Sequence, residues 1–436
     1  MKVPRFNTSE ANFGPVWARL VARRDGPHDD QVVADTRNIV EQIRGGGDQA
    51  LVALTARFEQ RPNLTAAELE VPRSAWDQAL GRLSPELRQA LERAAARIRA
   101  FHGLQRGDLL ETHLDDGRGI VAELLVRPLA RVGLYVPGGT AAYPSTVLMN
   151  ALPAKVAGVP EVVMVTPAKG GQIADPVLAA AAIAGVDRLF GIGGAQAVAA
   201  LAYGTQSVPA VDKIVGPGNA WVQEAKRQVY GQVDIDTIAG PSEVLIVADE
   251  SADPEVVAAD LLAQAEHDVR SAALLLTWIP ALADRVAEAL ARQVATLPRL
   301  KEATAAILGR GGIVLCKDSE EALALANHYA PEHLGLAVEQ PRRALERIEN
   351  AGAVFLGHHT PEALGDYNAG VNHVLPTSGA ARFGSPLSVH DFVKRTSVLA
   401  VEVQGLLRIG DDAIRLARAE GLEAHARAIE LRQKRG

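Results

Sequence analysis

The sequence predicts an α/β protein that contains two parallel sheets. Short runs rich in Val, Ile and Leu alternate with stretches whose apolar residues have helical spacing, and glycine-rich turns follow several of the runs. Strand, tight turn and helix in alternation are typical of parallel strands joined by crossover helices. The alternation occurs twice in a chain of 436 residues, which is long enough for two or more domains.

Helices are expected ahead of the first sheet, because apolar residues recur at helical spacing over 8–24, 34–59 and 84–103. The strand-like runs of the first sheet are 130–139, 161–168, 186–194, 211–219 and 242–249. The helix-like stretches between them are 145–158, 175–185, 195–204 and 220–231.

The same alternation predicts a second sheet further along the chain. Its strand-like runs are 271–278, 311–316, 334–339 and 351–357. Helices are expected between them near 280–297, 319–328 and 341–350. The tail differs, with one strand at 396–404 and a helical pattern over 411–435 that Gly421 should interrupt.

The composition is that of an ordinary globular protein, with 48% hydrophobic and 22% charged residues. The formal net charge is −7, and interspersed charges of both signs give no sign of a nucleic-acid partner. The N-terminal residues lack a hydrophobic signal core and no apolar run is long enough to span a membrane, so we expect a cytoplasmic protein. The single cysteine, Cys316, excludes a disulfide framework and a cysteine-based zinc site, and we interpret it as a buried structural thiol.

Three glycine turns raise the question of a nucleotide site. They occupy residues 133–139, 191–197 and 216–221. Backbone N–H groups and helix N-termini at such turns can approach a phosphate. None is a complete G-x-G-x-x-G motif or a P-loop, so taken alone each is an ordinary strand-to-helix loop. At a topological switch point, however, the strand ends would place Tyr135, Gln196 and Asn219 beside one crevice, where they could bind a ribose or base.

A second question concerns the polar end of one helix. Asp253 can cap this helix and Pro254 suits its first position, so Gln264 and His267 lie three residues apart on one face. Two side chains at that spacing can reach one metal ion. An ordinary polar helix end is the alternative, since glutamine is an infrequent zinc ligand and a histidine there can offset the helix dipole.

Glu332 and His333 form another candidate pair, because they are adjacent, follow a proline and precede a strand. Neighbouring residues in a loop can both turn into a cleft, whereas on a strand they would face opposite sides. A Glu/His pair in a cleft can divide the work of proton transfer. A polar loop without chemistry is the alternative.

Two more polar groups lie towards the C-terminus. A glycine-rich loop, which by itself indicates a turn, holds Asp366, Asn368, Asn372 and His373. Asp366 would be an acceptable metal ligand. Glu420 and His425 flank Gly421 in the tail helices, where chance polar positions are the alternative.

Taken together, these motifs resemble the histidinol dehydrogenase family over almost the whole chain. The similar segments, in chain order, are EQIRGGGDQAL, GLYVPGGTAAYPSTVLMNALPAKVAG, GIGGAQAVAALAYGT, KIVGPGNAWVQEAKR, DTIAGPSEVLIVAD, LLAQAEHD, APEHL, LGDYNAGVNHVLPTSGAARF and FVKRTSV. So many long motifs in one order make the resemblance specific.

The resemblance implies a role for each matching residue. Implied ligands of a bound Zn²⁺ are Gln264, His267, Asp366 and His425. Glu332 and His333 are the implied acid–base pair. Implied NAD contacts are Tyr135, Gln196 and Asn219. Implied substrate contacts are Ser242, Gln264, His267, His333, Asp366, His373, Glu420 and His425.

The family fold implies an intertwined homodimer in which one α/β domain is inserted in another and the tail reaches the partner's site. The implied segments are an N-terminal helical segment associated with the tail domains at 1–28, a first α/β domain at 29–134 and 243–386, an inserted α/β domain with the NAD crevice at 135–242, and C-terminal tail domains at 387–436.

The implied reaction is the four-electron oxidation of L-histidinol to L-histidine through the aldehyde, with zinc, NAD⁺ and water. We expect His333 to be the base for both hydride transfers and Glu332 to activate the water. A thiohemiacetal on Cys316 is not expected, because this residue is distant in sequence from every motif. The alternatives are a dehydrogenase acting on another amino alcohol or sulfonate, a zinc hydrolase on an α/β scaffold, and a non-catalytic metabolite-binding protein.

Overall fold

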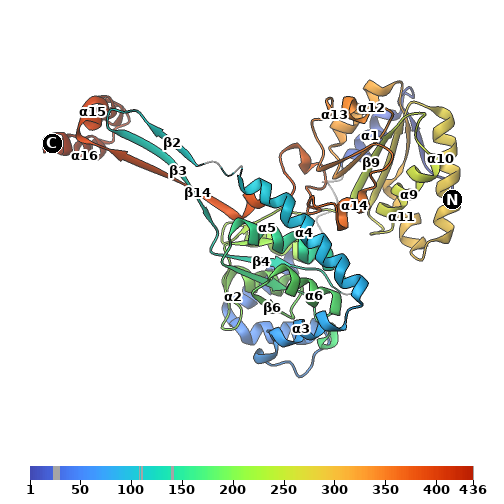
Figure 1. Ribbon diagram of the computed structural model, residues 1–436, viewed down its shortest axis with the longest axis horizontal. Coiled ribbons are helices and arrows are strands. Elements are labelled where there is room, and N and C mark those ends of the chain that lie inside the picture. Colours follow the sequence, from blue (N-terminus) through green and yellow to red (C-terminus); the bar gives the residue numbers. More distant parts are fainter. Residues whose placement is uncertain (23–29, 108, 110, 139–141, 436) are drawn as a thin grey trace.

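The computed structural model describes residues 1–22, 30–107, 109, 111–138 and 142–435, and it confirms the predicted α/β class. Two α/β bodies lie next to each other, and a long thin arm projects from one of them (Figure 1). Each body contains a parallel sheet, whereas the sheet of the arm is antiparallel. The C-terminus lies at the tip of the arm and the N-terminus at the opposite end of the molecule (Figure 1).

The larger sheet has six parallel strands in the order β1-β11-β10-β9-β12-β13. Their bounds are Arg5–Asn7 (β1), Glu243–Ala248 (β9), Ala272–Thr277 (β10), Gly312–Leu315 (β11), His333–Ala337 (β12) and Ala353–Leu356 (β13). Strands β9 and β10 are buried along their whole length because helices cover both faces of the sheet, which explains their unbroken apolar sequences. The run 242–249 was expected in the first sheet, but it forms β9 and pairs with β10 and β12 here, because an apolar run does not record which strands it joins.

Two helical layers cover this sheet. One consists of α9 (Pro254–Ala265), α10 (Pro280–Gln293) and α11 (Leu300–Arg310). The other contains α1 (Phe13–Val21) and α12 (Ser319–Tyr329), next to the short α13 (Pro341–Leu345). Helix α14 (Glu362–Tyr367) follows the last strand, β13.

The second sheet has five parallel strands in the order β6-β5-β4-β7-β8. Their bounds are Arg131–Tyr135 (β4), Glu161–Val165 (β5), Arg188–Phe190 (β6), Lys213–Val215 (β7) and Asp234–Ile235 (β8). One core contains α3 (Arg73–Arg82), α4 (Pro85–Gly107), α5 (Pro144–Ala157) and α6 (Asp175–Ala184). The other contains α2 (Asp30–Phe58), which is kinked at Gly47, with α7 (Gly194–Tyr203) and α8 (Ala220–Val229).

The arm is a three-stranded antiparallel sheet that carries two helices at its tip (Figure 1). Its strands are β2 (Thr112–Asp115), β3 (Ile120–Pro128) and β14 (Val393–Val401). The tip helices are α15 (Val403–Ala419) and α16 (Glu423–Gln433). The predicted break at Gly421 is confirmed, since this residue has a φ of 77° between the two helices.

Some helices and strands pack in a different body from the one that the resemblance implied for their segment. Within 29–134, helices α2, α3 and α4 pack on the five-stranded body rather than with the strands of 243–386. Within 1–28, β1 joins the six-stranded sheet beside β11, not the tail. The physical reason is that an apolar helix face records burial but not which sheet buries it. None of the described helices is long and apolar enough to cross a membrane.

Candidate active site

A cluster of carboxylate and imidazole groups lies at the amino edge of the six-stranded sheet. His333 is the first residue of β12, Glu332 precedes it, and Glu243 begins the neighbouring β9. Helices α9 and α12 run against the strands, so their carboxyl ends face this same edge. Helix carboxyl ends carry partial negative charge, which favours a cation here.

The tautomer of His333 follows from its hydrogen bonds. Its Nδ1–H donates to the carbonyl oxygen of Glu243 at 3.0 Å, and the Glu243 N–H donates to Glu332 Oε2 at 2.8 Å. His333 Nε2 is buried and has no hydrogen-bond partner in the described part of the chain. Burial lowers the pKa of His333 to about 3. The ring is therefore neutral, with the lone pair of Nε2 free to accept a proton.

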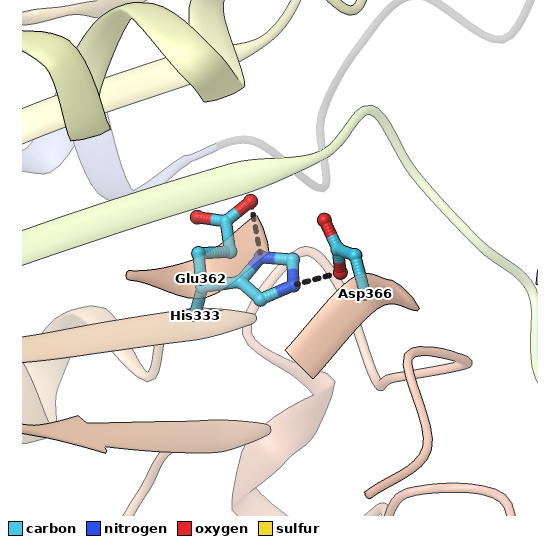
Figure 2. A group of neighbouring side chains, drawn as sticks. All are labelled: His333, Glu362 and Asp366. Atoms are coloured by element: carbon cyan, nitrogen blue, oxygen red, sulfur yellow. Dashed lines mark ion pairs between the residues drawn. The ribbon is translucent and has the colours of Figure 1, made fainter. Parts of the chain in front are cut away.

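Two carboxylates from α14 flank the His333 ring (Figure 2). Glu362 Oε1 lies 3.8 Å from Nδ1, and Asp366 Oδ1 lies 3.9 Å from Nε2. These three side chains offer ligand atoms within 4.8 Å of one another, a spacing that could hold a metal ion. Burial raises the pKa of Asp366 to about 6 and, together with Asp366 and Glu332, raises that of Glu362 well above its usual range. A bound cation would offset this cost of ionising them.

Gln264 and His267 come together at the carboxyl end of α9, as their spacing predicts. Gln264 Nε2 lies 3.0 Å from His267 Nδ1, and the Gln264 side chain is completely buried. Its Oε1 has no hydrogen-bond partner within the described residues. A buried amide oxygen without a partner is costly, so an oxygen-seeking cation fits this position.

Two of the other predicted substrate contacts border the cluster. His373 donates Nδ1–H to the backbone oxygen of Asp366 at 2.9 Å, and burial lowers the pKa of His373 to about 4. Ser242 directly precedes β9, and its carbonyl accepts from the N–H of Ala272 at 3.0 Å.

Glu420 and His425 are not brought to the cluster by their own chain. Glu420 caps the end of α15 and His425 is exposed on α16. Both helices lie at the tip of the arm, on the opposite side of the molecule from α14 (Figure 1). One chain therefore supplies only part of the predicted ligand set.

Three acidic members of the cluster were missed by sequence reasoning. Glu362 lies four residues before Asp366, and Asp260 lies four residues before Gln264, so helical spacing could have revealed both. Burial raises the pKa of Asp260 to about 6. Glu243 gives no such signal, because it is an ordinary first residue of a buried strand.

A separate cleft of about 600 Å³ lies at the carboxyl edge of the five-stranded sheet. Tyr135, Gln196 and Asn219 all line it. Tyr135 ends β4 and Asn219 follows β7, the two strands between which the strand order reverses. The structure thus brings these residues together at the expected switch point. Whether they contact NAD stays a prediction.

Glu59, just after α2, clamps two loops on the floor of this cleft. Its carboxylate accepts the Ala168 N–H at 2.6 Å and the Gly193 N–H at 2.7 Å. It is 5% exposed and also lines the cleft. The Gly193 N–H belongs to the second predicted glycine turn, and because it is already bonded it is not free to bind a phosphate.

A buried ion pair supports the third loop. Lys226 pairs with Asp236 and donates to the carbonyl of Gly216 at 3.1 Å, while Asp236 accepts the Gly216 N–H at 2.7 Å. Asn219 accepts the Val222 N–H at 3.1 Å and so caps α8. These contacts therefore fix the backbone that carries Asn219.

Known proteins resemble this chain over its whole length. A sequence model described as histidinol dehydrogenase matches residues 22–433. The histidinol dehydrogenase of Syntrophotalea carbinolica is 52% identical over 427 residues, covering 98% of both chains. That of Pseudomonas aeruginosa is 50% identical over 431 residues, covering 99% of this chain and 97% of its own.

The structural comparison agrees. A crystal structure of histidinol dehydrogenase from Elizabethkingia anophelis matches with a TM-score of 0.91 at 35% identity, covering 99% of this chain and 98% of that one. The resemblance seen in the motifs is thus confirmed at the level of sequence and of fold. The chain belongs to the histidinol dehydrogenase family.

Proposed function

We propose that this enzyme oxidises L-histidinol to L-histidine through the aldehyde, with bound zinc and with NAD⁺ as the electron acceptor. The family establishes the coarser assignment, a dehydrogenase of histidine biosynthesis. The observation that carries the finer proposal is the buried Nε2 of His333, which has no hydrogen-bond partner among the described residues and lies 3.9 Å from Asp366 Oδ1. A neutral imidazole nitrogen with a free lone pair can take the hydroxyl proton during an alcohol oxidation.

The residues present fit a zinc ion. Gln264 supplies a buried oxygen to which no described residue donates a hydrogen bond, and Asp366 supplies a carboxylate whose pKa burial raises to about 6. His267 stands beside Gln264, and His425 would complete the set from the arm of a second subunit. When bound, Zn²⁺ would orient the nitrogen atoms of the amino alcohol and NAD⁺ would accept the hydride.

The chain's own residues then handle the protons. In the first oxidation His333 Nε2 takes the hydroxyl proton of the alcohol as the hydride leaves. Glu332 removes a proton from the water that adds to the aldehyde. His333 returns its proton to the aldehyde oxygen as the water adds, which completes the diol, and it takes a hydroxyl proton again when the diol is oxidised. Tyr135, Gln196 and Asn219 would hold the nucleotide, and Ser242, His373 and Glu420 would contact the substrate.

We further propose that the active unit is a homodimer with shared sites. The arm exposes large apolar side chains, among them Leu399 at 68% and Leu416 at 65%. Leu364 and Tyr367, which flank Asp366, are also exposed at 46% and 60%. Burying these surfaces against each other would cover both and bring Glu420 and His425 to a partner's cluster.

Absorbance of NADH tests the reaction directly. Wild-type enzyme should form two NADH per L-histidinol, prolonged chelation should abolish this activity, and Zn²⁺ should restore it. Other amino alcohols or sulfonates, offered in parallel, test the related-dehydrogenase alternative. Full activity of a metal-free preparation would refute the zinc assignment, and hydrolysis without NADH would favour the zinc hydrolase.

Subunit mixing tests the shared site. Glu332→Gln and His425→Asn subunits should each be nearly inactive alone. After exchange in equal amounts, half the dimers should be mixed and each should contain one intact site, giving about a quarter of wild-type activity. No recovery despite proven exchange would contradict a site shared between subunits.

A further inference from the structure

The loop that follows α14 joins the two α/β bodies. Asp366 lies in α14 itself, not in the glycine-rich loop where the sequence placed it, and belongs to the cluster beside β12. Val374, Leu387 and Phe392 further along are buried in the core that contains α4 and α5 of the other body. His373 lies between these two anchorages and bonds to the Asp366 backbone at 2.9 Å. The loop thus carries a proposed substrate contact across the boundary between the bodies.

A proline creates an unpaired carbonyl where this loop meets α5. Pro153 lies inside the helix and is buried. Proline has no N–H, so the helical hydrogen bond from position 153 to the carbonyl of Met149 cannot form. Asn372 donates Nδ2–H to that carbonyl at 2.7 Å. The loop supplies the hydrogen that the helix lacks.

The other polar groups of Asn372 are also used. Its Oδ1 accepts the Val374 N–H at 2.9 Å, and its Nδ2 lies 3.4 Å from His102 Nε2. His102 Nδ1 lies 2.7 Å from Gln105 Oε1, which already accepts the Val389 N–H. Because Nδ1 must therefore carry hydrogen, Nε2 is the acceptor for Asn372. Both polar atoms of the buried Asn372 side chain therefore have hydrogen-bond partners at this position.

The backbone of the loop also lies directly on α4. A Cβ added at Gly370 would come within 3.0 Å of the carbonyl oxygen of Arg97, and Gly370 has a φ of 102°. The contact therefore depends on glycine. Together with the Asn372 bonds, it fixes the stretch that ends in His373.

We propose that Asn372 is a positioning residue, which holds His373 and the Asp366 backbone against the cluster by filling the hydrogen-bond gap that Pro153 leaves in α5. The inference rests on the proposed function, because the substrate contact of His373 belongs to it. The nucleotide cleft should be insensitive, since its lining residues include none from α4, α5 or this loop. Replacing Asn372 should therefore raise KM for the amino alcohol and leave KM for NAD⁺ unchanged.

Asn372→Ala leaves the Met149 carbonyl unpaired and frees the loop. We expect it to lower Tm, and to raise KM for L-histidinol on the order of tenfold or more with KM for NAD⁺ within about twofold. Pro153→Ala, added to it, returns an N–H to the helix but does not reattach the loop. In the double variant Tm should recover in part while KM for L-histidinol stays high.

A merely structural role predicts that both quantities recover together in the double variant, and that result would overturn the proposal. An unchanged KM for L-histidinol in folded Asn372→Ala would overturn it as well. The matched control is Asn150→Ala, because Asn150 is a buried amide in the same helix whose hydrogen bond among the described residues stays within that helix, to the carbonyl of Thr146 at 2.7 Å. It should lower Tm and leave both KM values unchanged. If Asn372→Ala does not fold, Asn372→Ser is judged by the same readouts.

Calorimetric binding of L-histidinol to the zinc-loaded protein separates this inference from the proposed reaction. Weaker binding by Asn372→Ala supports the positioning role even if the wild-type protein forms no NADH. The absence of NADH would contradict only the proposed reaction. If wild type and Asn372→Ala bind L-histidinol equally well and wild-type turnover is normal, only the positioning role is contradicted.

Discussion

In the five-stranded sheet the candidate ligand groups lie at the carboxyl edge, whereas in the six-stranded sheet they lie at the amino edge. At the carboxyl edge, helix amino ends such as that of α8 favour an anionic ligand. At the amino edge, helix carboxyl ends such as that of α9 favour a cation. At each edge, the partial charge of the helix ends is opposite to the charge of the ligand proposed there. Ligands of parallel sheets usually bind at the carboxyl ends of the strands, and only the five-stranded body follows this rule.

The largest expected effect separates chemistry from nucleotide binding. His333→Asn removes the base, so kcat should fall by about 10²–10⁴-fold. Affinity for NAD⁺, measured by fluorescence or calorimetry, should stay unchanged, because the cleft lies on the other sheet. His359→Asn is the control, since this histidine is exposed. Equal losses in kcat and NAD⁺ affinity would show that the two edges do not act separately.

Glu59→Ala tests the carboxyl edge in the converse way. Without the clamp the loops after β5 and β6 lose a shared acceptor, and KM for NAD⁺ should rise by about tenfold with KM for L-histidinol unchanged. Steady-state kinetics with each substrate varied will measure both. Glu70→Ala is the control, because it breaks only an ion pair with Arg188 near the surface of the same body. A rise confined to L-histidinol would contradict the assignment of the cleft.

A smaller effect should appear in the stability of the metal-free protein. Glu362 has a pKa raised by burial and by neighbouring carboxylates, so its contribution is favourable at low pH and is lost as the pH rises through the folded-state pKa. Glu362→Gln should therefore raise Tm more near pH 8 than near pH 4. Exposed Glu288→Gln should show no such trend. A Tm gain that is larger near pH 4 than near pH 8 would contradict a raised pKa of Glu362 at the amino edge.

The smallest effect is expected for Cys316→Ser. This thiol is 5% exposed, and burial raises its pKa to about 12, so it does not supply a thiolate at neutral pH. Turnover for both oxidations, followed as NADH per substrate, should stay within about twofold of wild type. Selective loss of the second oxidation would instead support a thiohemiacetal on this residue.

Local patterns predicted much of the fold. The strand-like runs that became β4 and β9, and the tail break at Gly421, could be recognised because composition and turn residues act over a few positions. The arm was recognised only in part. Its β3 strand has no buried face, and all nine residues are at least partly accessible, so no alternation marked it.

The candidate site was harder to predict because its members come from distant segments. Gln264 and His267 share a helix and could be paired from spacing alone. Glu243 enters the site only through the pairing of β9 with β12, which no local pattern records. The resemblance named His425, yet neither spacing nor the fold of one chain explains how it reaches the cluster.

The pairing of β3 with β14 sets an order on biosynthesis. Val401 lies opposite Ile120, so the arm joins strands from distant parts of the chain. A growing chain can form the five-stranded sheet early, since its last strand ends at Ile235, but Val374, Leu387 and Phe392 complete the core of that body much later. The arm can close only after residue 401 has left the ribosome. The surface through which the proposed dimer would form is thus among the last parts to mature, and this would delay dimer assembly until both sheets have been synthesised.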